Sequence, residues 1–229
     1  QEQLEERTFA PLRRTGKGYY LLVAGLLLII AWGAFAYYTQ IKNGLIMTSM
    51  RDRISWGLYI ALFVFFIGAS MAGTFVSAIL RISQASWRKP VTRAAEMVTV
   101  AALITAALFI TFDIGSPERM PNLIFLGRWE SPVVWDVYGL ITYLVGSVTY
   151  LYTAAIPDLA LCRDRIGLQV TWLKRWFYGA FAIDWSDTPK QRRFLHRSLG
   201  VMMILIIPVA VTMHTVTSWL FAMTLREPW

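Results

Sequence analysis

"WGLYIALFVFFIGASMAGTFVSAIL" (residues 56–80) contains 25 residues and no charged side chain. A helix needs about 20 predominantly apolar residues to cross the hydrocarbon core of a membrane. Inside lipid every backbone N–H and C=O needs a partner within the chain, and a helix meets that requirement by itself. We therefore predict a transmembrane helix over residues 54–80. Four further segments meet the same criterion: 19–41, 94–112, 133–156 and 198–223.

The composition points to the same class of protein. Apolar residues make up 56% of the chain and charged residues 16%, and the mean hydropathy is +0.49. A soluble domain needs a more polar exterior than this. The alternating pattern of membrane strands is missing, so we predict an all-α integral membrane protein with five transmembrane helices. Residues 1–18 form an N-terminal tail and residues 19–229 the transmembrane domain.

Lysine and arginine are concentrated at alternate ends of the five segments, and the richer ends of transmembrane helices face the cytoplasm. The richer ends carry Arg7, Arg13, Arg14 and Lys17, then Arg81, Arg88, Lys89 and Arg93, then Arg163, Arg165, Lys174, Arg175, Lys190, Arg192, Arg193 and Arg197. The poorer ends carry Lys42, Arg51, Arg53, Arg119, Arg128 and Arg226. We therefore predict a cytoplasmic N-terminus and an outer C-terminus. This bias and anionic lipid explain the formal net charge of +8 better than nucleic-acid binding does.

Three titratable residues fall at the outer ends of the segments in this topology. Asp113 ends the third segment, Asp136 opens the fourth, and His214 lies about two turns inside the outer end of the fifth. Ionisable groups at membrane depth are costly and usually face a bundle interior or a water-filled cavity. We predict that these three side chains share a polar pocket. The alternative is structural: Asp113 pairs with Arg119, Asp136 caps its helix, and His214 bonds a neighbouring helix.

Two patterns predict which helix faces meet inside the protein. Polar and aromatic residues follow one stripe of the fourth segment: Asp136, Tyr143, Ser147 and Tyr150. Small residues form rows on the second segment, where they favour close helix packing: Gly68, Ala69, Ala72, Gly73 and Ser77.

Glu96 lies three residues after Arg93, which predicts an exposed ion pair; a role for Glu96 in a proton path is the alternative.

The cytoplasmic connection before the fifth segment has two features of its own. Residues 166–183 combine Trp and Phe with Lys174 and Arg175, which predicts an interfacial helix on the inner leaflet. In "SDTPKQRRFLHRS", Asp187 or Thr188 can cap a helix that has Pro189 at its first position. The fifth helix is then expected to start in the cytoplasm and to hold His196 outside the hydrocarbon.

The residue inventory narrows the choice of cofactor. His196 and His214 are the two histidines, and eighteen residues of one helix separate them by roughly 27 Å, so they cannot clamp one haem. Cys162 is the single cysteine, so we predict no iron–sulfur cluster and no metal in this chain. Two carboxylates, a histidine and tyrosines suit a small molecule that exchanges protons, such as a lipid-soluble quinone.

Four stretches together resemble the NrfD-like membrane subunits of polysulfide reductase and of alternative complex III. They are residues 56–80 above, "FDIGSPERMPNL" (112–123), "SPVVWD" (131–136) and "IPVAVTMHTVTSWLFAMTLREPW" (207–229). The resemblance implies one peripheral helix plus a four-helix bundle with a haem-free site for menaquinone or ubiquinone. It also implies a bacterial cytoplasmic membrane, an iron–sulfur subunit on the outer, periplasmic side, and other membrane subunits of a respiratory or photosynthetic complex.

By this resemblance Asp113, Asp136 and His214 lie near the quinone ring or its proton exit. We predict these three as catalytic residues of quinol oxidation or quinone reduction. The predicted quinone-binding residues are His214, Asp136, Tyr143 and Arg119, and the predicted proton path uses Asp113 and Glu96. Two functions from other classes stay open: a non-catalytic membrane anchor of a redox complex, and a proton-translocating channel or transporter subunit.

The chain departs from the family pattern in two ways. Family members carry a second helix bundle, so the sequence is expected to be either a short homologue or part of a longer chain. Members of the alternative complex III type tend to carry a histidine on the second helix, where this chain has Ser70 and Met71.

Overall fold

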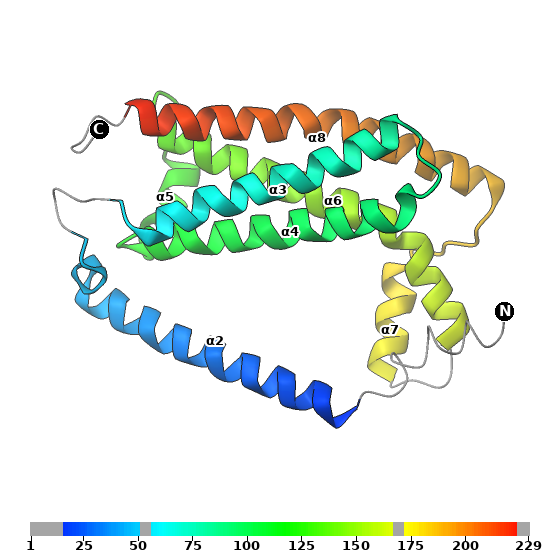
Figure 1. The fold of residues 1–229 in the computed structure, drawn as a ribbon, viewed down its shortest axis with the longest axis horizontal. Helices are drawn as coiled ribbons and strands as arrows, with labels where there is room; N and C mark the ends of the chain where they lie inside the picture. Colours follow the sequence, from blue (N-terminus) through cyan, green and yellow to red (C-terminus); the bar gives the residue numbers. More distant parts are fainter. Residues whose placement is uncertain (1–15, 51–55, 167–171, 224–229) are drawn as a thin grey trace. The chain divides into compact units, whose positions relative to one another are not determined.

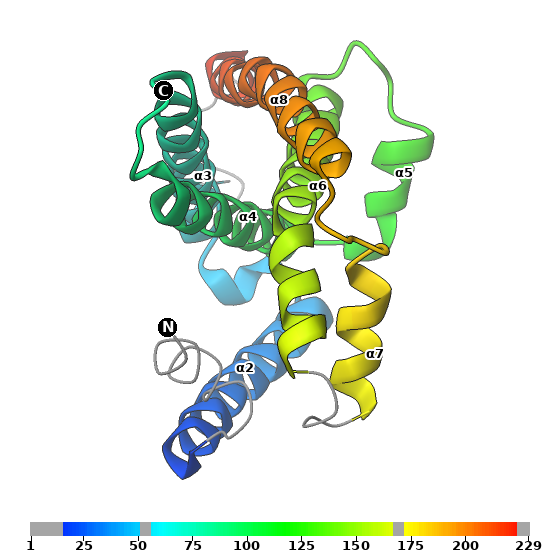
Figure 2. The ribbon, with the colours of Figure 1, turned by 90° about the vertical axis from the view of Figure 1, so that its right-hand side faces the viewer.

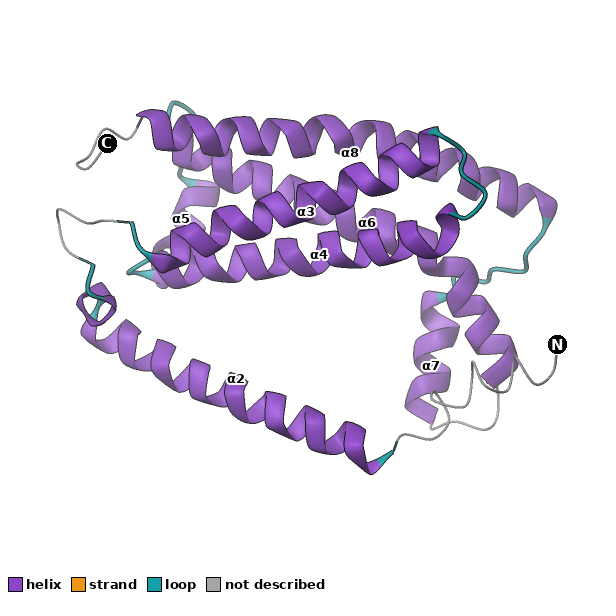
Figure 3. Ribbon diagram, viewed as in Figure 1, coloured by secondary structure: helices purple, strands orange, loops and turns teal. Residues whose placement is uncertain are grey.

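The structure is a computed structural model that describes residues 16–50, 56–166 and 172–223. The regular structure in these ranges is helical (Figures 1 and 3). The elements are α2 (Lys17–Asn43), η1 (Leu45–Thr48), α3 (Leu58–Ile82), α4 (Arg88–Asp113), η2 (Pro117–Arg119), α5 (Met120–Phe125), α6 (Pro132–Ile166), α7 (Trp172–Phe181) and α8 (Pro189–Met223). Most of the predicted tail, together with Arg51, Arg53 and Arg226, lies outside the described residues.

Within the described residues, five helices are long and apolar enough to cross a membrane: α2, α3, α4, α6 and α8. This confirms the predicted all-α membrane fold. All of these helices except α3 are longer than the predicted spans, most clearly α6, which continues through Pro157 to Ile166, and α8, which begins at Pro189. A hydropathy span ends at the first polar residues, whereas a helix continues for as long as its backbone hydrogen bonds can form.

The chain divides into two compact units, one made of residues 1–38 and 153–196 and the other of residues 39–152 and 197–229. In the first unit the end of α6 packs against the segment after α7 through Ala160, Ala182 and Trp185. Arg163 Nη2 also donates to the Trp185 carbonyl at 2.8 Å.

Helix α7 lies within the predicted interfacial segment and exposes Trp172 and Trp176. Its position on the inner leaflet stays a prediction, and residues 167–171 of that segment lie outside the described residues.

Helix α8 starts with a reciprocal cap. The Thr188 hydroxyl accepts a hydrogen bond from the Gln191 backbone N–H at 3.3 Å, and Gln191 Oε1 accepts one from the Thr188 N–H at 3.2 Å. This is a capping box with Pro189 at the first helical position, as the sequence predicts. Asp187, the other candidate cap, pairs instead with Arg192, and this hydrogen bond holds the pKa of the Asp187 carboxyl below its usual range.

Removing the cap is expected to loosen the first turn of α8. Replacing Thr188 with Ala costs about 1 kcal/mol of helix stability, which corresponds to roughly fivefold faster exchange of the amide hydrogens of Gln191 and Arg192. Hydrogen–deuterium exchange measures this effect. Thr215→Ala is the control, because Thr215 is exposed in the interior of the same helix. Unchanged exchange at the start of α8 contradicts the assignment of Thr188 as the cap.

The second unit contains a four-helix bundle of α3, α4, the first part of α6 and most of α8 (Figure 2). Helices α3 and α4 approach each other closely at Gly73. A Cβ atom there would lie 2.4 Å from Thr99 Oγ1 and 2.7 Å from the Ala95 carbonyl oxygen. The predicted small-residue row therefore does pack closely at Gly73, whereas a Cβ atom at Gly68 would meet nothing within 4 Å.

Helix α6 is fixed in the bundle by contacts with α3 and α8. The Tyr143 and Thr74 hydroxyls are hydrogen-bonded at 2.6 Å. At Gly139 a Cβ atom would lie 2.9 Å from the sulfur of Met213, so α8 also packs tightly on α6. The interior of the bundle thus combines small residues with a few hydrogen-bonded polar side chains, as helix interfaces in membranes do. By contrast, the apolar 18-residue window of α2 has no buried residues, which agrees with the predicted peripheral helix.

Candidate functional site

Asp136 lies inside the bundle, near the start of α6. It is the fifth residue of a helix that begins at Pro132, so it is not the helix cap. Its side chain is 4% exposed, and its Oδ1 atom accepts a hydrogen bond from the Thr217 hydroxyl of α8 at 2.5 Å. A buried carboxylate needs such donors, because burying an unpaired charge is costly. The hydrogen bond therefore joins Asp136 to the C-terminal part of α8.

His214 lies one helical turn before Thr217. Its Nδ1 atom is 3.0 Å from the Ala210 carbonyl oxygen of the same helix. A carbonyl oxygen only accepts hydrogen bonds, so Nδ1 carries a proton, and in the neutral ring Nε2 presents a lone pair. The Nε2 atom is buried and has no hydrogen-bond partner among the described residues. This nitrogen is thus placed to accept a hydrogen bond from a bound molecule.

Asp113 is the last residue of α4 and is half-buried. Its Oδ1 atom is buried and has no hydrogen-bond partner within the described ranges. Arg119 is exposed, and no ion pair joins these two described residues. No hydrogen bond or ion pair joins Asp113 to Asp136 or His214 either. Asp136 is therefore bonded one helical turn from His214, whereas Asp113 Oδ1, at the end of α4, has no hydrogen-bond partner among the described residues.

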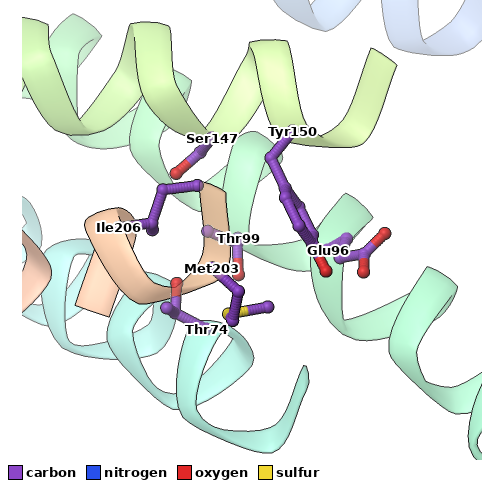
Figure 4. Close-up of a pocket in the computed structure, with 7 residues that line it drawn as sticks. All are labelled: Thr74, Glu96, Thr99, Ser147, Tyr150, Met203 and Ile206. Carbon is purple, nitrogen blue, oxygen red and sulfur yellow. The ribbon is translucent and has the colours of Figure 1, made fainter. Parts of the chain in front are cut away.

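The polar stripe predicted on α6 faces the interior of the bundle. Tyr143 is fully buried with its hydroxyl engaged by Thr74, and Ser147 and Tyr150 are buried as well. Ser147 and Tyr150 line a small cavity together with Thr74, Glu96, Thr99, Met203 and Ile206 (Figure 4). This cavity lies near the middle of α6, and its nearest α6 residue, Ser147, comes eleven positions after Asp136.

Glu96 lines the same cavity, so the prediction of an exposed ion pair is wrong in one respect. The pair with Arg93 is present at 3.7 Å, but the Glu96 side chain is only 5% exposed and accepts a hydrogen bond from Ser77 at 3.0 Å. The reason is that Glu96 lies on the face of α4 that meets α3, where Ser77 donates to it. The helix starts at Arg88, so Glu96 lies two turns inside it and faces the bundle rather than the solvent.

Sequence reasoning missed Thr217, which connects Asp136 to α8. There was little indication in the sequence that Thr217 contacts another helix, because threonines are common in this chain and often donate to a carbonyl of their own helix. Thr217 does this as well, to the Met213 carbonyl at 2.9 Å. The one available clue was its position three residues after His214, on a neighbouring face of the same helix.

Replacing Thr217 with Val, which has nearly the same shape, is expected to remove the donor to Asp136. A buried carboxylate that loses a hydrogen bond is destabilised by about 1.5–3 kcal/mol, so the thermal midpoint of the purified protein is expected to fall by several degrees. Thr215→Val is the matched control, since the Thr215 hydroxyl bonds the Val211 carbonyl and is exposed. Equal midpoints for both variants would show that the Asp136 contact contributes nothing.

The bundle, the buried Asp136 and the half-buried His214 define a helical membrane protein with polar side chains between its helices. The chain belongs to the family described as "Polysulphide reductase, NrfD", whose sequence profile matches residues 46–229. It is 34% identical over 207 residues to a putative membrane subunit of dimethyl sulfoxide reductase from Halobacterium salinarum, covering 90% of this chain and 43% of that protein.

Two further relatives are more distant. A selenate reductase subunit from Mesobacillus selenatarsenatis is 21% identical over 220 residues, which is 93% of this chain and 50% of that protein. The Hdr-like menaquinol oxidoreductase integral membrane subunit of Archaeoglobus fulgidus is 29% identical over 154 residues, covering 67% of this chain and 38% of that protein. The chain thus spans half or less of the length of these relatives.

Proposed function

We propose that this chain is the membrane subunit of a quinone-linked oxidoreductase complex and that it oxidises quinol at a site formed by His214 and Asp136. The observation that carries the proposal is the buried Nε2 atom of His214, which lacks a partner among the described residues and lies one turn from the residue that bonds Asp136. A quinol hydroxyl would supply the donor that this nitrogen lacks. The relative named as a menaquinol oxidoreductase subunit supports menaquinol as the substrate.

Each of the site residues has a distinct role in this proposal. Oxidising one quinol to quinone releases two protons and two electrons. His214 takes the first proton on Nε2 while Nδ1 stays bonded to the Ala210 carbonyl, and the nearby Asp136 carboxylate stabilises the resulting imidazolium. Asp113 or Asp136 passes protons to the outer side. The two electrons would pass to an iron–sulfur cluster of a partner subunit, and quinone reduction would use the same groups in reverse.

Arg119 and Tyr143 are the other two residues proposed to contact the quinone, and they differ in exposure and in hydrogen bonding. Arg119 is exposed between η2 and α5, where a bound molecule or a partner subunit can reach it. The Tyr143 hydroxyl is already bonded to Thr74, so Tyr143 would support the site by packing. The proton path through Asp113 and Glu96 stays a prediction. Four further points also stay predictions. They are that the chain belongs to the alternative complex III subgroup, that the iron–sulfur subunit lies on the periplasmic side, that the membrane is a bacterial cytoplasmic membrane, and that the N-terminus is cytoplasmic.

A photoreactive menaquinone analogue tests the proposal in the intact complex. Irradiation is expected to label the α8 peptide that contains His214 and the α6 peptide that contains Asp136, and excess menaquinone is expected to suppress both labels. His214→Gln is expected to reduce the labelling, whereas His196→Gln, an exposed position on the same helix, leaves it unchanged. Labelling that excess quinone does not suppress contradicts the proposal and favours the membrane-anchor function.

A further inference from the structure

The connection between α4 and α6 carries a group of exposed apolar side chains at the end of α5 and just after it. Phe125, Leu126 and Trp129 are 81%, 77% and 65% exposed, although all three are large and apolar. We call these three residues the loop patch. The proposed quinol site does not use them. Adjacent exposed apolar side chains of this size indicate contact with a membrane or with another protein.

Contacts with the first turns of α6 hold the loop patch in place. The Tyr138 hydroxyl donates to the Ile124 carbonyl at 2.6 Å, and the Trp129 ring stacks on the Tyr138 ring with their centroids 5.1 Å apart. The indole N–H of Trp135 donates to the Trp129 carbonyl. Two backbone carbonyls of the loop thus have partners within the protein, which a segment in contact with lipid needs.

The loop lies on an outward face of α6. Figure 2 shows α5 on the opposite side of α6 from α3 and α4. Val134, Ile141 and Val148 follow one another at two-turn intervals on α6, and the latter two are exposed. Val134 is only 2% exposed, because the loop lies against it: a Cβ atom at Gly127 would be 2.7 Å from the Val134 side chain. The loop therefore covers the first part of an apolar stripe whose later part is exposed.

The position of the loop along α6 corresponds to the edge of the hydrocarbon core. Tyr138 comes six residues after Pro132, where α6 begins, so the loop contacts the helix about 9 Å from its start. Interfacial segments bury apolar side chains about 5–10 Å into the boundary between headgroups and acyl chains. Tryptophan is enriched at this level. Arg128 and Glu130 flank Trp129 and are exposed, so both can extend toward the headgroups.

We propose that the loop patch inserts into the interfacial region of the bilayer and contacts lipid acyl chains beside α6. Lipid is the expected occupant because the patch continues the exposed apolar stripe of a membrane-crossing helix. The loop joins the end of α4, where Asp113 lies, to the start of α6, where Asp136 lies. The insertion therefore anchors this end of the bundle in the membrane, and it does not depend on the quinol proposal.

Photo-crosslinking of the intact complex in its membrane tests the proposal. Benzoylphenylalanine in place of Phe125 puts a group that reacts with nearby C–H bonds at an exposed position, so the change leaves the packing of the chain intact. We expect irradiation to attach a phospholipid to the α5 peptide, detected by mass spectrometry. The same group at Val145 of α6, which is 59% exposed, is the reference for a lipid contact. A cross-link from position 125 to another subunit, or no lipid adduct there, overturns the proposal.

A double variant gives a second readout. Phe125→Ser combined with Leu126→Ser is expected to speed amide hydrogen exchange in residues 123–129 at least about tenfold in nanodiscs, because the loop loses its apolar contact with lipid. Serine and phenylalanine have similar helix propensities, so the end of α5 itself is little affected. Glu118→Ser is the matched control, since Glu118 is exposed in the same connection, and it is expected to leave the exchange unchanged. Unchanged exchange in the double variant means that the patch faces water, which contradicts the proposal.

Discussion

Replacing His214 with glutamine is expected to lower quinol oxidation by the assembled complex at least about 100-fold. Glutamine keeps a polar side chain of similar length, but its amide cannot take up a proton near neutral pH. The loss should therefore appear mainly in kcat, with a smaller effect on KM, because the amide can still hydrogen-bond the substrate. Steady-state oxidation of a soluble menaquinol analogue, with an artificial electron acceptor, measures both constants.

His196→Gln is the matched control for this experiment. His196 lies on the same helix, is exposed, and precedes His214 by eighteen residues. The proposed mechanism gives it no role, so this variant is expected to keep the wild-type turnover. Full activity in His214→Gln would exclude His214 as the proton acceptor and would favour the membrane-anchor function.

Replacing Gly73 with alanine is expected to destabilise the bundle more than any other single-methyl change in the α3–α4 contact. The added Cβ atom would lie 2.4 Å from Thr99 Oγ1 and 2.7 Å from the Ala95 carbonyl oxygen, which belongs to the backbone and cannot rotate away. The two helices must separate, which costs about 1–3 kcal/mol. We expect a lower thermal midpoint and a lower yield of assembled protein, measured in detergent or in nanodiscs.

Gly68→Ala tests whether this effect is specific. Gly68 is exposed on the same helix, and a Cβ atom there meets nothing within 4 Å. Alanine favours helix over glycine by up to about 1 kcal/mol, so this variant is expected to match or exceed the wild-type stability. Equal losses at both positions would show that α3 and α4 do not pack closely at Gly73.

The helices could be predicted from the sequence, because the information that sets them is local. An apolar run long enough to cross lipid leaves the backbone one arrangement that satisfies its own hydrogen bonds. The start of α8 could be predicted for the same reason, since the residues that form its cap, Thr188, Pro189 and Gln191, lie within four positions of one another. The inward stripe of α6 followed from helical periodicity alone.

The site could be predicted only in part, because its contacts join distant residues. The bond between Asp136 and Thr217 spans 81 positions, and nothing in the local sequence marks Thr217 as its donor. The burial of Glu96 was missed because its neighbour Arg93 suggested an exposed pair, whereas the packing of α3 on α4 decides the exposure. Nor does Asp113 pair with Arg119, although only five residues separate them in the described chain.

The central claim is that His214 of α8 and Asp136 of α6 form one quinol pocket. A density map of the intact complex with a bound quinol analogue tests it most directly. We predict a ring oxygen about 2.6–3.2 Å from His214 Nε2, with the Asp136 carboxylate bordering the same pocket. A ring bound elsewhere, or a side chain of another subunit bonded to His214 Nε2, would contradict the account.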